Sequence, residues 1–309
     1  MPGSSNDRVA PWAFAGVVAL MLLLALVWRF GQASSPAQAL ASKASRVDLV
    51  GQMQVALASA AEAEKSAVMA ATDQESQAFA DRSRAATAEL ERGRLELGRL
   101  LEAGGTPEER AKLAQFSSDF SALRAVDEEV LRLAVRNTNL KASALAFGPA
   151  AAELAALEEV LERLAARRAG TPQAGGVQRL ADRARLGVLH VQALLAPHIA
   201  EERDEGMTRL EAVMAEQARQ VHRALDELSS LAGAAEVAPA RASFARYLEL
   251  KGQALALSRE NTNVRSLALS LGQKRAAQAV CQDALAALQQ AILDEPIAGV
   301  SYGRVNPTR

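Results

Sequence analysis

The chain contains two copies of one segment, and this internal repeat constrains the fold more than any other feature of the sequence. Residues 120–148 align with residues 244–272 at a constant shift and without a gap, and nine of the 29 aligned positions are identical. The identical positions include the tripeptide Asn-Thr-Asn, which composition bias does not explain because neither residue is abundant here. The repeat therefore predicts two related modules of about 120 residues each.

The composition predicts that both modules are helical. Only 4% of the 309 residues are aromatic, whereas Ala, Leu, Glu and Arg, which favour helices, are abundant. Thr106 and Glu109 form a capping-box pattern with Pro107 at the first helical position, and residues 170–176, GTPQAGG, form the clearest linker. Similar start and stop patterns give four helices per module, and short connections favour an antiparallel four-helix bundle.

The repeated helix has a heptad pattern with an Asn in the middle of its apolar seam. Seam residues recur at alternating spacings of four and three on both sides of Asn137, and the second copy has the same spacing around Asn261. Such a seam should face neighbouring helices. The two seams are Val126, Val130, Leu133, Asn137, Leu140, Ala144 and Phe147, and Leu250, Ala254, Leu257, Asn261, Val264, Ala268 and Leu271.

Two interpretations of the seam asparagines stay open. A buried amide must be hydrogen-bonded or it destabilises the fold, so the pair could form a polar layer that fixes helix register. Alternatively, the amides and the polar residues beside them could line a small ligand pocket, with a neighbouring guanidinium for a carboxylate. The candidate ligand-binding residues are Asn137, Thr138, Asn139, Asn261, Thr262, Asn263 and Arg265.

We find no pattern that predicts catalytic residues, a metal site or a cofactor site. The sequence lacks a Gly-rich phosphate loop, a G-x-S-x-G and an H-E-x-x-H motif, and its single Cys excludes a Cys-rich zinc site and covalent haem. His198-x-x-Glu201 is one metal-like spacing where a di-iron bundle needs several, and Cys281 falls in an apolar seam where a buried thiol is expected. A net charge of −1 gives no general attraction to nucleic acid. An enzyme is not expected.

An uncharged run of 20 residues from Val9 to Trp28 predicts a membrane anchor. At about 1.5 Å per residue it spans about 30 Å, the thickness of the hydrocarbon core of a bilayer. Trp12 and Trp28 lie at its two ends, where interfacial tryptophans are enriched. A cleaved signal peptide is the alternative, although the apolar core of such a peptide is usually shorter. We expect the N-terminus inside the cytoplasm and the folded mass outside it.

The stretches 63–79, 136–150 and 259–272 resemble the extracytoplasmic four-helix-bundle sensor domains of methyl-accepting chemotaxis proteins. The resemblance covers both modules and the apolar N-terminal run, and the Asn-Thr-Asn helix contributes most to it. It implies a periplasmic bundle on a bacterial inner membrane that binds a small molecule, often at a dimer interface. The family's second transmembrane helix, HAMP linker and methylated hairpin do not follow here, so any signal output would need a partner protein.

The sequence therefore predicts a single-pass, sensor-like protein of the bacterial inner membrane that contributes to chemotaxis-type signalling through another protein. Its open helical seams also allow homodimerisation. The alternative is a non-catalytic envelope scaffold without a small-molecule ligand, in which the asparagines only set helix register. The expected segments are a cytoplasmic N-terminus (1–8), a transmembrane anchor (9–30), a linker (31–38), module 1 (39–170), a linker (171–176), module 2 (177–295) and a flexible tail (296–309).

Overall fold

The computed structural model of the protein describes Met21 and residues 36–296. Every regular element in this part of the chain is helical, which confirms the predicted all-α fold. The elements are α2 (Pro36–Met69), α3 (Asp73–Gly104), α4 (Pro107–Ala134), α5 (Thr138–Phe147), α6 (Pro149–Arg168), α7 (Ala174–Ala193), α8 (Leu195–Ala200), α9 (Asp204–Ala232), α10 (Ala234–Glu260), α11 (Thr262–Leu269), the π-helical turn η1 (Ser270–Lys274) and α12 (Arg275–Asp294).

The predicted membrane anchor falls almost entirely outside the described residues. Of the expected segment 9–30, only Met21 is described. None of the helices in the described part of the chain is both long enough and apolar enough to cross a bilayer. The anchor at Val9 to Trp28 therefore stays a prediction from the sequence.

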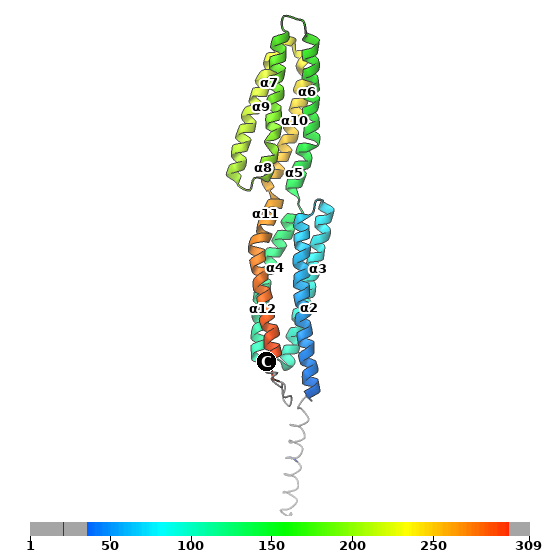
Figure 1. Ribbon diagram of the computed structural model, residues 1–309, viewed down its shortest axis with the longest axis vertical. Helices are drawn as coiled ribbons and strands as arrows, with labels where there is room; N and C mark the ends of the chain where they lie inside the picture. Colours follow the sequence, from blue (N-terminus) through cyan, green and yellow to red (C-terminus); the bar gives the residue numbers. More distant parts are fainter. Residues whose placement is uncertain (1–20, 22–35, 297–309) are drawn as a thin grey trace, which may run out of the picture.

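The helices form two bundles that stack end to end along the long axis of the molecule (Figure 1). Helices α2, α3, α4 and α12 pack together in the terminal bundle, which holds both ends of the described chain. Helices α6, α7, α9 and α10 pack together in the inserted bundle, where α5 and α8 complete the end that faces the terminal bundle. The chain therefore enters the inserted bundle once, after α4, and leaves it once, after α10.

This arrangement corrects the predicted boundaries of modules 1 and 2. One buried core runs from Ala142 to Ala254, and the other combines residues between Val50 and Leu123 with Cys281, Leu285, Leu288 and Ile292. Residues 138–168, assigned to module 1, thus pack with module 2, while residues 262–294 return to the terminal bundle. The composition of residues 170–176 suggested a linker between modules, but residues 170–173 form the turn of the α6–α7 hairpin at the far tip of the inserted bundle, and α7 begins at Ala174 (Figure 1).

Hydrogen bonds and ion pairs join the start of α2 to the end of α12 in the terminal bundle. The Lys43 ammonium donates hydrogen bonds of 2.6 Å to the main-chain oxygens of Leu293 and Glu295. The buried Arg46 guanidinium binds both carboxylate oxygens of Glu109, at 2.9 and 2.7 Å, and reaches Glu295 at 2.6 Å. The start of α2 and the end of α12 therefore lie at the same end of the molecule, away from the inserted bundle.

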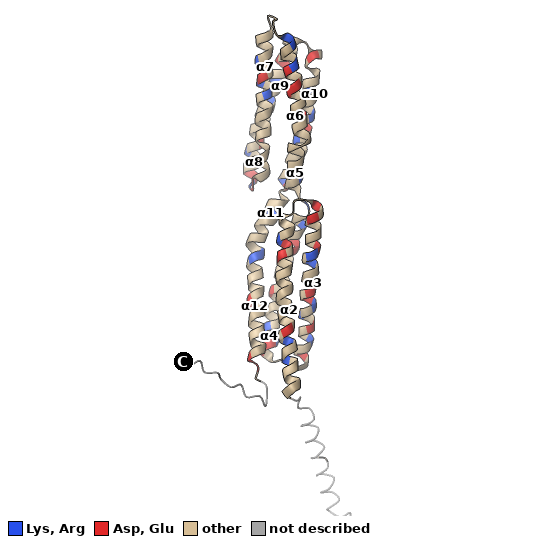
Figure 2. Ribbon diagram, turned by 45° about the vertical axis from the view of Figure 1, so that its right-hand side comes forward, with Lys and Arg blue, Asp and Glu red and all other residues tan. Residues whose placement is uncertain are grey.

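The expected helix caps and charged faces are present. Thr106 accepts from the Glu109 N–H while the Glu109 carboxylate accepts from the Thr106 N–H, so the predicted capping box is confirmed. Figure 2 shows acidic and basic residues interspersed along the helices of both bundles. Many of them pair at a spacing of three residues, as in Glu129 with Arg132. Such exposed pairs contribute little stability individually.

Candidate functional site

The two Asn-Thr-Asn copies meet at the boundary between the bundles, where α4–α5 and α10–α11 pass each other. The Thr138 N–H donates to Thr262 Oγ1 at 3.2 Å, and the Thr262 N–H donates to Thr138 Oγ1 at 3.1 Å. The Asn139 N–H likewise donates to Asn263 Oδ1 at 3.1 Å, and the Asn263 N–H donates to Asn139 Oδ1 at 3.2 Å. Each bond has a counterpart with the two copies exchanged, so the repeat forms a local two-fold junction.

Asn137 and Asn261 break the helices at this junction. Their φ angles are 49° and 52°, the only positive values among the described non-glycine residues. Asn tolerates this left-handed conformation better than other residues with a Cβ, because its short polar side chain bonds locally. The straight apolar seams predicted through both asparagines are therefore wrong beyond them. Leu140 and Phe147 are exposed, while Ala142 takes up the buried face of α5.

Every side-chain amide of the junction has a protein partner. Asn137 donates to Asp73 at 3.1 Å and accepts from Asn263 at 2.9 Å. Asn261 accepts from Asn139 at 2.7 Å and donates to the main-chain oxygen of the residue after α8 at 2.9 Å. The buried polar groups thus satisfy one another, as a register-fixing layer requires. This favours the interpretation of the asparagines as a structural layer over that of a ligand pocket.

The structure brings together six of the seven predicted site residues and leaves Arg265 apart. Arg265 is exposed on α11 and forms no hydrogen bond or ion pair with the junction within the described chain. The matching basic residue, Lys141, pairs with Asp73 at 2.8 Å, and this contact holds the pKa of the Asp73 carboxyl below its usual range. Arg136 and Glu260, which occupy equivalent positions of the two copies, form an ion pair at the junction's surface.

The histidine and cysteine that the sequence singled out lie in packed surroundings. His198 is buried between helices, with Nδ1 2.9 Å from Ser258 Oγ and Nε2 2.9 Å from Glu211, which also binds Arg259. No group of three or more His, Cys, Asp or Glu that could hold a metal occurs in the described residues. Cys281 is buried as predicted, and burial raises the pKa of its thiol to about 12.

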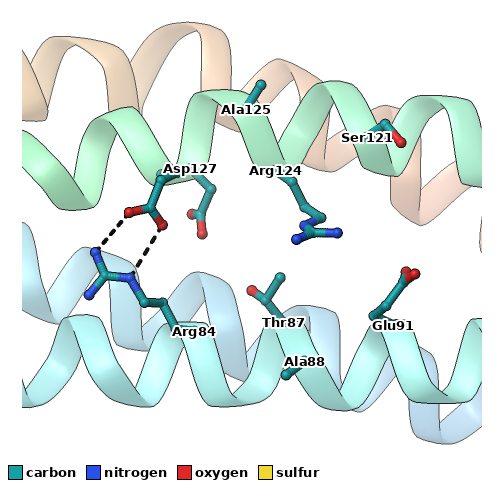
Figure 3. Close-up of a pocket in the computed structure, with 9 residues that line it drawn as sticks. Arg84, Thr87, Ala88, Glu91, Ser121, Arg124, Ala125 and Asp127 are labelled. Atoms are coloured by element: carbon teal, nitrogen blue, oxygen red, sulfur yellow. Dashed lines mark hydrogen bonds and ion pairs between the residues drawn. The ribbon is translucent and has the colours of Figure 1, made fainter.

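A groove opens in the terminal bundle between α3 and α4, and the sequence analysis did not anticipate it. Its volume is about 640 Å³. Helix α3 packs most closely along α2, and small side chains face the gap between α3 and α4. The lining residues are Arg84, Thr87, Ala88, Glu91, Ser121, Arg124, Ala125, Asp127 and Glu128 (Figure 3).

Beneath the groove lies a smaller space that shares Asp127 with it. This space has a volume of about 10 Å³ and lies within the apolar core formed by residues such as Leu57, Leu90 and Phe120. Thr87, Arg124 and Asp127 line both the groove and the smaller space, and Lys274 lines the inner one only. The carboxyl group of Asp127 therefore stands at the floor of an opening that leads from the solvent toward the core.

Three buried charges are clustered at this floor. Lys274 Nζ donates to Glu64 Oε2 at 2.6 Å and lies 3.6 Å from Asp127 Oδ1. Glu64, Lys274 and Asp127 are only 0%, 3% and 8% exposed. Within the described chain, Glu64 Oε1 and Asp127 Oδ1 have no hydrogen-bond partner. Burial raises the pKa of Asp127 to about 6, against the partial compensation of the nearby Lys274.

The sequence did contain a pattern that could have revealed this cluster. Counting back seven residues from Cys281 in its apolar seam gives Lys274. Asp127 follows Leu123 by four residues and precedes Val130 by three, so it also occupies a seam position. Charged residues in a heptad seam that is otherwise apolar are expected to be buried and paired. Asp127 and Lys274 match none of the catalytic or metal-binding motifs, so only their positions in the heptad pattern could have indicated them.

Comparison with known proteins adds no assignment to either site. The chain matches no known protein-family model, and no curated protein is detectably similar to it. The resemblance to chemotaxis sensor domains therefore stays a prediction, and the junction and the groove are interpreted from their own geometry.

Proposed function

We propose that the protein is a membrane-anchored, sensor-like protein that binds a small polar ligand in the α3–α4 groove. In this proposal the apolar run from Val9 to Trp28 spans the membrane and the two stacked bundles stand outside the cytoplasm. In the same proposal, the signal passes to a partner protein. The proposal that this signalling is of the chemotaxis type rests on the sequence resemblance alone.

The observation that carries the proposal is the incompletely paired Asp127 carboxylate at the floor of an open groove. A buried carboxylate without a full set of partners destabilises a protein. A helical scaffold gains nothing from such a group, and an apolar residue at the same seam position would pack better. A ligand that forms the missing hydrogen bonds would offset the energetic cost of burying the carboxylate.

The route of a signal can follow the covalent path of α4. Asp127 lies on α4, which leads directly into the junction, and Lys274 lies on η1, which follows the second copy of the same tripeptide. A ligand that shifts α4 relative to α12 would therefore act on both chain segments that lead into the junction, α4–α5 and α10–α11. Helix α12 ends beside the start of α2, and α2 follows the predicted anchor in the sequence.

Ligand binding can be tested by thermal unfolding of the full chain in detergent micelles against amines, amino acids and organic acids. A ligand at a hundredfold excess over its dissociation constant stabilises the folded state by about 2.7 kcal/mol. The substitution Ala88→Trp fills the groove and should abolish the shift. Ala155→Trp, at an exposed alanine of α6, is the matched control and should preserve it.

The anchor needs a separate test. Full-length protein should stay with the membrane fraction after extraction with alkaline carbonate, and a variant lacking residues 9–28 should be released. Release of the unmodified protein would contradict the anchor and leave ligand binding in the groove unaffected.

The alternative function, an envelope scaffold without a small ligand, is supported by the complete internal pairing of the junction amides. In that case the thermal shift experiment would show no stabilisation by any compound. Binding to another envelope protein would then be the property to measure.

A further inference from the structure

The buried cluster at the groove floor has fewer positive than negative side chains, and Arg124, which also lines this region, is exposed to solvent. The buried cluster holds two carboxylates, Glu64 and Asp127, and one ammonium, that of Lys274. Lys274 hydrogen-bonds Glu64 at 2.6 Å but is 3.6 Å from Asp127, too far for a hydrogen bond. The oxygen of Asp127 that faces Lys274 is therefore left without a hydrogen-bond partner in the described structure. An added cation at Asp127 would balance the cluster.

The size of the inner space limits what that cation can be. Its volume of about 10 Å³ is close to the minimum that holds a single water molecule. A primary ammonium group is of this size, whereas the planar guanidinium of an arginine-like ligand is larger. The described residues also offer no cluster of three or more ligands for a metal ion. A compact –NH₃⁺ group on a longer molecule fits these limits.

The groove above has room for the remainder of such a molecule. Its two other carboxylates are already paired, Glu128 with Arg84 at 3.0 Å and Glu91 with Arg94 at 2.7 Å. Arg124 extends from α4 into the space between the helices (Figure 3), and its guanidinium lies 5.8 Å from the centre of the Phe120 ring. It forms no hydrogen bond or ion pair within the described chain. The groove therefore offers one carboxylate at its floor and one guanidinium on its wall.

We infer that the groove recognises a small molecule through a primary ammonium group, which donates hydrogen bonds to the Asp127 carboxylate at the groove floor. This inference rests on the proposed function, because it names the ligand class of the same groove. The ammonium group can belong to a plain alkylamine or to an amino acid. In an amino acid, the carboxylate would in addition meet the Arg124 guanidinium, a pairing that favours fork-like geometry.

The test is titration calorimetry on the full chain in detergent micelles, with n-butylamine, 1,4-diaminobutane, a panel of amino acids and succinate as probes. We expect at least one ammonium compound to bind, and Asp127→Asn to weaken it by more than about tenfold. Glu128→Gln, the adjacent groove carboxylate, is the matched control and should change binding by less than about threefold. Asp127→Asn keeps the shape of the side chain and removes a buried charge, so circular dichroism and thermal unfolding should show an intact fold.

The remaining outcomes separate the inference from the function it rests on. Arg124→Gln should weaken an amino acid and leave a plain alkylamine unaffected, which identifies the source of the ammonium group. Binding of succinate but of no amine, blocked by Ala88→Trp, would overturn the ammonium inference and support ligand binding in the groove. Amine binding that survives Asp127→Asn would overturn the inference as well. If no probe binds, the space holds water only and both proposals fail.

Discussion

The terminal and inserted bundles are built around equivalent halves of one repeat, yet they bury different chemistry. Phe120 and Phe244 occupy matching positions and are buried in both bundles. About two helical turns farther along each copy, the terminal bundle buries Asp127 while the inserted bundle has Lys251, which is only half-buried. Burial lowers the pKa of Lys251, an effect that Glu211 opposes. The two copies thus share the buried Phe but differ in the charged residue that follows it.

The same contrast appears on the helix that follows the second copy. Lys274 in the terminal bundle corresponds, two positions past the aligned repeat, to Ala150 in the inserted bundle, and both side chains are buried. The inserted core around Ala150 is aliphatic and aromatic, with Leu157, Leu161 and Tyr247 among its fully buried residues. The terminal bundle therefore buries a charged side chain at a position where the inserted bundle buries a small apolar one, and a buried charge cluster stabilises a fold less than apolar packing does.

The largest effect should come from removing the cation of the cluster. Lys274→Ala leaves Glu64 and Asp127 buried together without a positive partner, and we expect it to lower the free energy of unfolding by about 3–5 kcal/mol. Lys251→Ala in the inserted bundle should change it by less than about 1 kcal/mol, because no buried carboxylate depends on that lysine. Urea unfolding of both variants measures the difference. Equal effects would mean that the two bundles do not differ in the way the burial suggests.

The junction offers a test of symmetry between the two bundles. Asn137→Leu and Asn261→Leu each place an apolar side chain, which cannot form hydrogen bonds, at a residue with positive φ. Each should lower the free energy of unfolding by about 2–4 kcal/mol. Asn→Gly at the same positions should cost less, because Gly adopts this conformation freely and loses only the amide contacts. Urea unfolding should give similar values for the two copies. A large effect at one copy alone would show that the two-fold junction is symmetric in geometry but not in energy.

The sequence predicted the helical class, the capping box at Thr106 and the burial of Asn137 and Asn261, because these depend on local residue preferences and on a repeat visible without coordinates. It could not predict that Thr138 would bond to Thr262. That contact depends on two helices passing in opposite directions, and no local pattern encodes the direction in which a distant helix returns. For the same reason the turn at residues 170–176 was mistaken for a boundary between modules.

The heptad pattern predicted the wrong buried face beyond the asparagines for a different reason. A heptad count assumes one continuous helix, and a single left-handed residue rotates everything that follows it. Leu140 and Phe147 therefore became exposed although their spacing places them in the seam. The groove was missed because a space between α3 and α4 depends on how far apart two helices pack, which spacing within each helix does not determine.

The pH dependence of stability should differ between the wild type and Asp127→Asn. Asp127 has a folded pKa of about 6 against a reference of 3.8, with Lys274 on η1, Glu64 on α2, Arg84 on α3 and Glu128 on α4 as the surrounding charges. The folded state binds the proton more tightly than the unfolded chain. This carboxyl therefore contributes stability that is fully present below pH 4 and is lost as the pH rises through about 6.

Wild-type protein should consequently lose about 2–3 kcal/mol relative to Asp127→Asn between pH 4 and pH 7. The comparison with the variant is necessary because other carboxyls have the opposite pH dependence. Lys141 lowers the pKa of Asp73 and Arg259 lowers that of Glu211, so the stability that these two groups contribute is lost as the pH falls. Both proteins share those groups, so their effect cancels in the difference. Unfolding curves in urea at four or five pH values measure it, and parallel pH profiles would show that Asp127 titrates normally.

The smallest effect is expected at the ion pair between Arg136 and Glu260, the charged rim of the junction. These side chains are 48% and 39% exposed, so water screens their attraction. Arg136→Ala should lower the free energy of unfolding by less than about 1 kcal/mol, well below the cost of either Asn→Leu change beside it. A double-mutant cycle with Glu260→Ala would isolate the coupling of the pair. A coupling as large as the Asn→Leu effect would mean that charge rather than the buried amides holds the two bundles together, and the comparison of the bundles would have to begin from that rim.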